Sequence, residues 1–94
     1  MKNPEDCKNL SEIREEIDAI DEEIISMLGK RLLYVKVAAR FKSKVKVPER
    51  IRQMLVTRKK WAQQKSLDSS EIIKIYKDLL NYFSKEQEKL IKKK

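Results

Sequence analysis

The sequence contains no histidine, one cysteine, one glycine and two prolines. Cys7 has no partner for an internal disulfide, which agrees with a reducing compartment. Zinc sites and histidine-based catalytic triads are excluded because their ligands and bases are missing, and we expect neither a metal nor a cofactor. So few glycines and prolines, in a chain that is 40% charged, are typical of a helical protein.

Long apolar runs are missing as well. No stretch approaches the roughly 20 apolar residues that span a bilayer, and no signal-peptide pattern is present. We therefore expect a cytoplasmic protein without a membrane partner. With 94 residues, we expect one domain over residues 1–94, with a thin core if it stands alone. An extended lead-in over residues 1–8 and the lysine tail at 92–94 are expected to be mobile.

The net charge of +8 allows two interpretations. Clusters of cations within residues 42–46, 58–60 and 92–94 are compatible with nucleic-acid binding, and this class stays a rival. Surface lysines also keep small proteins soluble, whatever they bind.

The stretch Leu10–Lys42 predicts one very long helix. Its apolar residues recur three and four positions apart, at Leu10, Ile13, Ile17, Ile20, Ile24 and Met27. Asn9 is a suitable cap, with Glu12 as its reciprocal partner. The helix would be roughly 50 Å long, more than two short helices can cover in a compact monomer. We therefore predict an all-α fold in which two chains form an intertwined homodimer.

Two further helices complete the predicted fold of three helices. After a basic loop over Ser43–Val47, Pro48 begins a second helix, which ends within residues 63–66. At helical spacing it carries Ile51, Met54, Leu55, Arg58, Trp61 and Ala62. Asp68 caps the third helix, with Glu71 three residues later and Leu67 paired with Ile72 as a hydrophobic staple. The core row of this helix is Ile72, Tyr76, Leu79 or Leu80, Phe83, Gln87, and Leu90 or Ile91.

Three polar side chains, Arg31, Lys42 and Gln87, fall on or beside these apolar rows. Arg31 and Lys42 are three helical turns apart, about 16 Å along the axis, and could bracket a small anion. Arg14 lies roughly 25 Å from Arg31 on the same helix, so only a second, antiparallel chain brings these two arginines together. The alternatives are cations that snorkel to water and a glutamine that bonds a neighbouring helix.

Such a pocket would be rich in hydrogen-bond donors and would lack an obvious nucleophile. Arginine forks match carboxylates, which indicates a small anionic substrate with one or more carboxylates. Catalysis would then consist of holding one conformer and stabilising the negative charge that develops as a bond to oxygen breaks.

In these residues the sequence resembles the all-helical chorismate mutase family, and within it the isochorismate pyruvate lyases of salicylate biosynthesis. The matching stretches are Pro4–Cys7, Ile13–Asp18, Gly29–Arg31, Tyr34–Lys42, Pro48–Arg50, Met54–Leu55, Trp61–Ala62, Leu67–Asp68 and Glu86–Gln87. Each stretch is short, but together and in register they are specific. The resemblance implies three helices and a homodimer with two shared active sites.

The resemblance also implies roles for individual residues. Arg14 of the partner chain and Arg31 would bind the carboxylates of a small dicarboxylate substrate. Lys42 would contact the ether oxygen or a carboxylate, and Gln87 the ether oxygen of the breaking bond. Arg50 matches a further pocket arginine, although a salt bridge with Glu49 or another acid is nearly as good an account of it. The apolar wall would consist of Val35, Ala38, Ile51, Met54 and Phe83.

The chain departs from the family pattern at two places. Mutases specialised for chorismate usually carry a glutamate where this chain has Ile51, and the loop Ser43–Val47 is a few residues shorter than in the lyases. We therefore expect conversion of isochorismate to salicylate and pyruvate, with rearrangement of chorismate to prephenate as a second activity. The alternatives are a dedicated chorismate mutase of aromatic amino-acid biosynthesis and a non-enzymatic nucleic-acid-binding or coiled-coil module.

Overall fold

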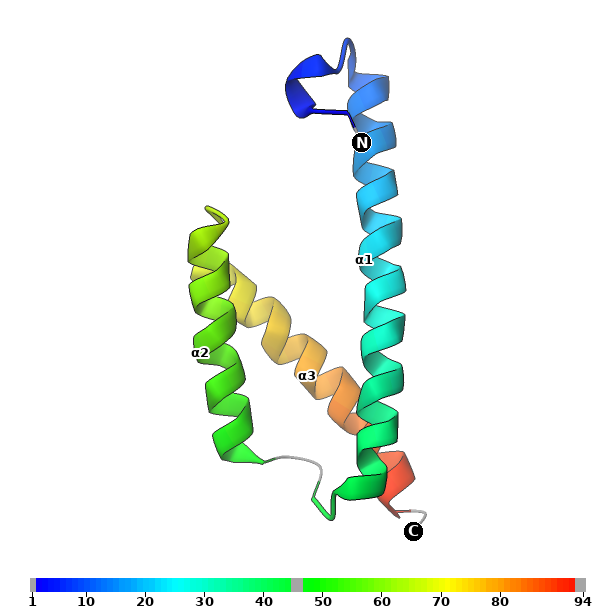
Figure 1. The fold of residues 1–94 in the computed structure, drawn as a ribbon, viewed down its shortest axis with the longest axis vertical. Coiled ribbons are helices and arrows are strands. Elements are labelled where there is room, and N and C mark those ends of the chain that lie inside the picture. Colours follow the sequence, from blue (N-terminus) through cyan, green and yellow to red (C-terminus); the bar gives the residue numbers. More distant parts are fainter. Residues whose placement is uncertain (1, 45–46, 93–94) are drawn as a thin grey trace. The chain divides into compact units, whose positions relative to one another are not determined.

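A computed structural model describes residues 2–44 and 47–92, which form three α-helices and two short 3-10 helices (Figure 1). In chain order these are η1 (Pro4–Asp6), α1 (Leu10–Ala38), η2 (Ala39–Phe41), α2 (Pro48–Gln64) and α3 (Ser69–Lys92). The described residues contain no strand, so the predicted all-α fold with one long first helix is confirmed.

The chain divides into two compact units, Met1–Tyr34 and Val35–Lys94, which are described separately. In the lead-in, which we expected to be extended, Pro4–Asp6 instead form one turn of 3-10 helix, because proline suits a first helical position. Residues 45 and 46 of the predicted loop and residues 93 and 94 of the predicted tail lie outside the described residues. None of the helices described has the length and apolar character that crossing a bilayer requires.

In the first unit, α1 begins at the predicted cap. The side-chain oxygen of Asn9 accepts a hydrogen bond from the Glu12 N–H at 2.9 Å. The Glu12 carboxylate in turn accepts one from the Lys8 N–H at 2.6 Å, one residue before the position that a capping box uses. This bond, followed by the ion pair with Lys2 at 3.2 Å, holds the pKa of Glu12 below its usual value.

The apolar row of α1 is exposed to solvent in the single chain. The exposed fraction of its six residues ranges from 39% at Ile13 and Ile20 to 61% at Met27. A surface helix normally turns such a row toward a core. This face of α1 is therefore an unpaired apolar surface in one copy of the chain.

In the second unit, α2 and α3 are joined by a tight turn. The N–H groups of Ser66 and Leu67 donate to the carbonyls of Gln63 and Ala62 at 3.2 and 2.9 Å, the bond pattern of a Schellman motif. Ser66 has a positive φ of 59° there. One oxygen of Asp68 accepts bonds from the N–H groups of Ser70 and Glu71 at 3.0 and 3.3 Å, which confirms the predicted cap of α3.

The core of the second unit is small. Its buried members are Ala39 of η2, Met54 and Ala62 of α2, and Phe83 and Gln87 of α3. α3 packs against both α2 and η2. Trp61, which follows the helical spacing of the row on α2, is 51% exposed. Its ring lies at the edge of the core, 4.8 Å from the Arg58 guanidinium, which gives the aromatic face a cation–π contact.

Candidate active site

Lys42 and Gln87, the two residues predicted to act at the breaking bond, are in contact within the second unit. The Lys42 ammonium donates a hydrogen bond to Oε1 of Gln87 at 3.1 Å. Nε2 of Gln87 donates to the main-chain oxygen of Val35 at 2.7 Å. These bonds join a lysine just after η2, a glutamine of α3 and the last turn of α1. Whether the three groups act on a substrate stays a prediction.

The surroundings of this cluster are apolar and tightly packed. Phe83, one helical turn before Gln87, is only 2% exposed, and its ring meets the edge of Tyr82 at a centroid distance of 5.1 Å. Gln87 is 3% exposed. Hydrogen bonds in such a low-dielectric site are electrostatically stronger than in water, and leaving one unmade is costly.

The backbone brings Lys42 to this site by leaving the helix. α1 tightens into the 3-10 turn η2 after Ala38, and Lys42 follows with an extended conformation (φ −126°, ψ 141°). We expected this helix to reach Lys42, but its α-helical part ends at Ala38. The change of direction leaves Lys42 half-buried rather than on the continuation of a straight helix.

The other predicted residues of the second unit differ in how far they are buried. Arg50 is exposed and borders a shallow hollow with Thr57 and Trp61. Glu49 forms an ion pair with Arg52, and the alternative account of Arg50, a salt bridge with Glu49 or another acid, stays a prediction. Within the predicted apolar wall, Met54 and Phe83 are buried, whereas Val35 and Ala38 at the end of α1 are half-buried.

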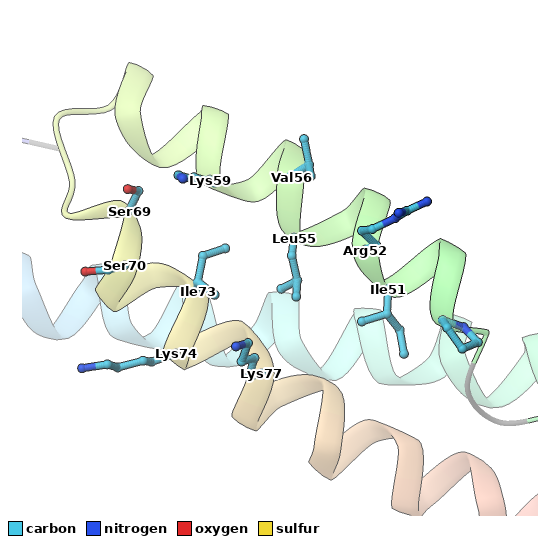
Figure 2. A pocket seen from close by; sticks show the side chains of 11 residues that line it. Ile51, Arg52, Leu55, Val56, Lys59, Ser69, Ser70, Ile73, Lys74 and Lys77 are labelled. Atoms are coloured by element: carbon cyan, nitrogen blue, oxygen red, sulfur yellow. The ribbon is translucent and has the colours of Figure 1, made fainter.

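Ile51 lines a groove between α2 and α3 that sequence reasoning did not find (Figure 2). Leu55 and Val56 of α2 and Ile73 of α3 give this groove an apolar lining. Its positive side chains are Arg52, Lys59, Lys74 and Lys77. Neither Lys42 nor Gln87 lines this groove. The part of Ile51 in a substrate site stays a prediction. The sequence did contain an indication of this groove, because Arg52, Val56 and Lys59 are spaced four and three positions apart and so lie along one side of α2.

Arg14 and Arg31 belong to the first unit. Arg14 is exposed, and Arg31 is half-buried with its Nη1 atom shielded from solvent. Their predicted part in the site stays a prediction.

Comparison with known proteins decides the family. Residues 13–88 match the family model described as chorismate mutase type II. The isochorismate pyruvate lyase of Pseudomonas aeruginosa is 41% identical over 90 residues, which are 93% of this chain and 89% of that protein. The chain belongs to the chorismate mutase type II family.

In this member of the chorismate mutase type II family, the Lys42 ammonium and the Gln87 amide meet in the second unit. An ammonium in partly dry surroundings is suited to stabilising negative charge that develops on an oxygen. The chemistry that this arrangement supports is electrostatic stabilisation of a rearranging substrate.

Sequence reasoning missed two groups of the site. One is the main-chain oxygen of Val35, a residue expected only as apolar wall. The other is Ala39, which is 2% exposed and lies between Val35 and Lys42 in the chain. Ala39 shares the matching stretch Tyr34–Lys42 with them, but only its burial against a neighbouring helix distinguishes it from the other alanine, Ala38.

Proposed function

We propose that this family member is a pericyclic enzyme that converts isochorismate to salicylate and pyruvate and, in the same site, rearranges chorismate to prephenate. The observation that carries the proposal is the contact of the Lys42 ammonium with Gln87 beside the buried Phe83. The 41% identity to the lyase of P. aeruginosa supports it. The alternative is a dedicated chorismate mutase.

Both reactions break the ether bond between the ring and the pyruvyl side chain. In the lyase reaction a ring hydrogen moves to the terminal carbon of the departing group as the carbon–oxygen bond breaks, and the products are salicylate and pyruvate. In the mutase reaction that carbon bonds to the ring instead, and the product is prephenate. Negative charge grows on the ether oxygen in either case, and Lys42 stabilises it there.

Arg14 and Arg31 bind the substrate carboxylates, and Arg50 borders the pocket. Bidentate contacts of this kind fix one substrate conformer, and a reaction within one molecule gains most of its rate from such restriction. The apolar residues Val35, Ala38, Met54 and Phe83 exclude water. Each of these roles is part of the proposal.

The preference for isochorismate rests on Ile51. An isoleucine cannot accept a hydrogen bond from a ring hydroxyl, whereas mutases specialised for chorismate usually carry a glutamate at this point. The pocket therefore lacks the polar partner that would favour chorismate. A substrate hydroxyl that is buried without a hydrogen-bond partner costs binding free energy, which weakens the binding of chorismate.

We also propose that the enzyme is an intertwined homodimer with antiparallel α1 helices. The exposed apolar row of α1 needs a partner surface, and a second α1 supplies a matching one. The first half of α1 is acidic, with Glu12, Glu15, Glu16, Asp18, Asp21, Glu22 and Glu23. The groove between α2 and α3 is basic, so the charges of the two chains are complementary.

The cytoplasm is the proposed compartment, without nucleic-acid or membrane partners. The single thiol of Cys7 agrees with a reducing environment. A nucleic-acid-binding protein would account for the net charge of +8, but it would not need a glutamine buried against a lysine in its core.

Product analysis tests the proposed activity. The purified chain is given isochorismate and chorismate in separate reactions, and the products are followed by NMR. Salicylate and pyruvate from isochorismate support the lyase. Prephenate from chorismate, without enzymatic salicylate from isochorismate, would make the chain a dedicated mutase. Turnover of neither substrate would refute both.

A further inference from the structure

The main-chain oxygen of Val35 lies in the last turn of α1, which ends at Ala38. A carbonyl oxygen has two lone pairs, so it can accept a bond from a side chain in addition to a bond within its own helix. The side chain of Gln87 donates such a bond to Val35 at 2.7 Å. A residue of α3 is thus tied to the end of α1.

This bond determines which way the Gln87 amide faces. Its nitrogen can only donate and its oxygen can only accept. With the amide reversed, its oxygen would face the Val35 oxygen and its nitrogen would face the Lys42 ammonium, so both bonds would be lost. Since Gln87 is 3% exposed, water does not replace them easily. The Val35 carbonyl therefore keeps Oε1 of Gln87 directed at Lys42, 3.1 Å away.

Ala39 governs how closely α3 approaches this point. It lies in η2, against which α3 packs, and its side chain is 2% exposed. A larger side chain in a closely packed position forces the neighbouring backbone to shift. A shift of α3 away from η2 would lengthen the bond between Gln87 and Val35. The small side chain at position 39 is therefore needed for the hydrogen bond that holds Gln87 to Val35.

We propose that Gln87 acts as a positioning residue for Lys42, held in place by the Val35 carbonyl and by the close packing at Ala39. The inference rests on the proposed function, because Lys42 is the group that meets the ether oxygen. It adds to the direct contact that the family resemblance implies for Gln87. Oε1 of Gln87 fixes the ammonium, while one N–H of Gln87 is already engaged by Val35.

Kinetics of Gln87→Met test the positioning. Methionine keeps the length and volume of the side chain but neither holds Lys42 nor bonds Val35. We expect kcat to fall about 10- to 100-fold, because a small misplacement of a reacting group costs that much, with KM changed less than about threefold. Gln64→Met makes the same change on an exposed turn of α2 and should leave both constants unchanged.

A double-mutant cycle separates positioning from packing. Ala39→Val leaves Lys42 and Gln87 intact but moves α3, so kcat should fall in the same range. In the Gln87→Met background the added Ala39→Val change should lower kcat no further, because the hydrogen bond between residue 87 and Val35 is already absent. Two effects that simply multiply would mean that Ala39 acts only through stability. If Ala39→Val does not fold, Ala39→Cys makes a smaller change of the same kind.

NMR detects the hydrogen bond between Gln87 and Val35 without any measurement of turnover. The through-bond coupling between Nε2 of Gln87 and the carbonyl carbon of Val35 should be measurable in the native protein and lost in Ala39→Val. Its absence in the native protein overturns the inference, as does an unchanged kcat in Gln87→Met. Absence of activity on both substrates, with the coupling present, refutes the proposed function instead. The two failures are therefore distinguishable.

Discussion

Gln87 accepts a hydrogen bond from Lys42 at 3.1 Å across 45 residues of sequence. The same glutamine donates to Val35, 52 residues away, so one side chain connects the end of α1 with the residue after η2. These two bonds favour one orientation of the buried amide, because reversing it would lose both. The site is thereby coupled to the packing of α3 on η2.

Removal of the Lys42 side chain should abolish most activity without unfolding the protein. Lys42→Ala deletes the cation that stabilises charge on the ether oxygen, and we expect kcat/KM to fall by about a thousandfold, equivalent to ~4 kcal/mol of transition-state binding. Loss of chorismate absorbance measures the rate. Lys60→Ala, an exposed lysine of α2, is the matched control. Near-native rates in Lys42→Ala would refute the proposed site.

A charge placed on the exposed apolar row of α1 should dissociate the dimer. Ile20→Asp introduces a carboxylate on the face that we propose to be buried between two chains, and burial of an unpaired charge is strongly unfavourable. Ser26→Asp places the same charge on the opposite side of the helix and should leave the dimer intact. Sedimentation velocity at several concentrations measures the state. A native protein that sediments as a folded, active monomer contradicts the prediction.

Ser66→Gly should stabilise the turn between α2 and α3. Ser66 has a φ of 59°, a left-handed conformation that costs an L-residue about 1–2 kcal/mol and that glycine adopts freely. Because glycine also has a more flexible unfolded state, we expect a net gain of about 0.5–1 kcal/mol in the free energy of unfolding. Thermal melts at one protein concentration measure it. Ser26→Gly, inside α1, should instead lower the melting temperature.

The helix ends were predictable because their signals are local. Asn9 and Asp68 accept the bonds that their sequence positions suggest, and Pro48 begins α2 as expected. Gln87 was identified because a polar residue interrupted an apolar row. Spacing alone does not determine burial, because Trp61 fits the period of the row on α2 and is still 51% exposed.

Other parts of the site depend on contacts that periodicity does not encode. The Val35 oxygen accepts a bond from Gln87, a residue 52 positions away on another helix, and no local pattern encodes such a contact. Burial of Ala39 depends on the same contact. The groove between α2 and α3 needs two helices to be placed together before its lining exists. The proposed partnership of Arg14 with Arg31 would need a second chain.

The cap at Asp68 should make stability depend on pH in a defined direction. The Ser70 hydroxyl, followed by the N–H of Glu71, holds the pKa of Asp68 below its usual value. A carboxylate with a depressed pKa in the folded state stabilises above its unfolded pKa, and this stabilisation is lost as pH falls through the folded pKa. The native protein should therefore melt higher than Asp68→Asn near pH 7, and the difference should shrink below about pH 4.

Melts from pH 7 to pH 3 provide the measurement. Asp78→Asn removes an exposed carboxylate from the middle of α3, where it has no cap to form, and serves as the control. A constant difference between the native protein and Asp68→Asn over the whole range would show that the capping bonds do not require the ionised carboxylate.

The shared active site makes a specific prediction for mixtures of two inactive variants. Arg14→Ala and Arg31→Ala should each lose most activity, since each removes one carboxylate contact from both sites of a homodimer. In a heterodimer of the two variants, both substitutions fall in one site. The other site then takes its native Arg14 from one chain and its native Arg31 from the other, and is complete.

Unfolding and refolding an equimolar mixture should therefore restore about a quarter of the native specific activity, because half of the dimers are mixed and each has one complete site. Mixing without refolding is the control and should restore little if the dimer exchanges slowly. A mixture of Arg14→Ala with the double variant Arg14→Ala/Arg31→Ala contains no complete site in any pairing and should stay inactive. If refolding the first mixture restores nothing while each variant folds and dimerises, the two arginines belong to sites within one chain.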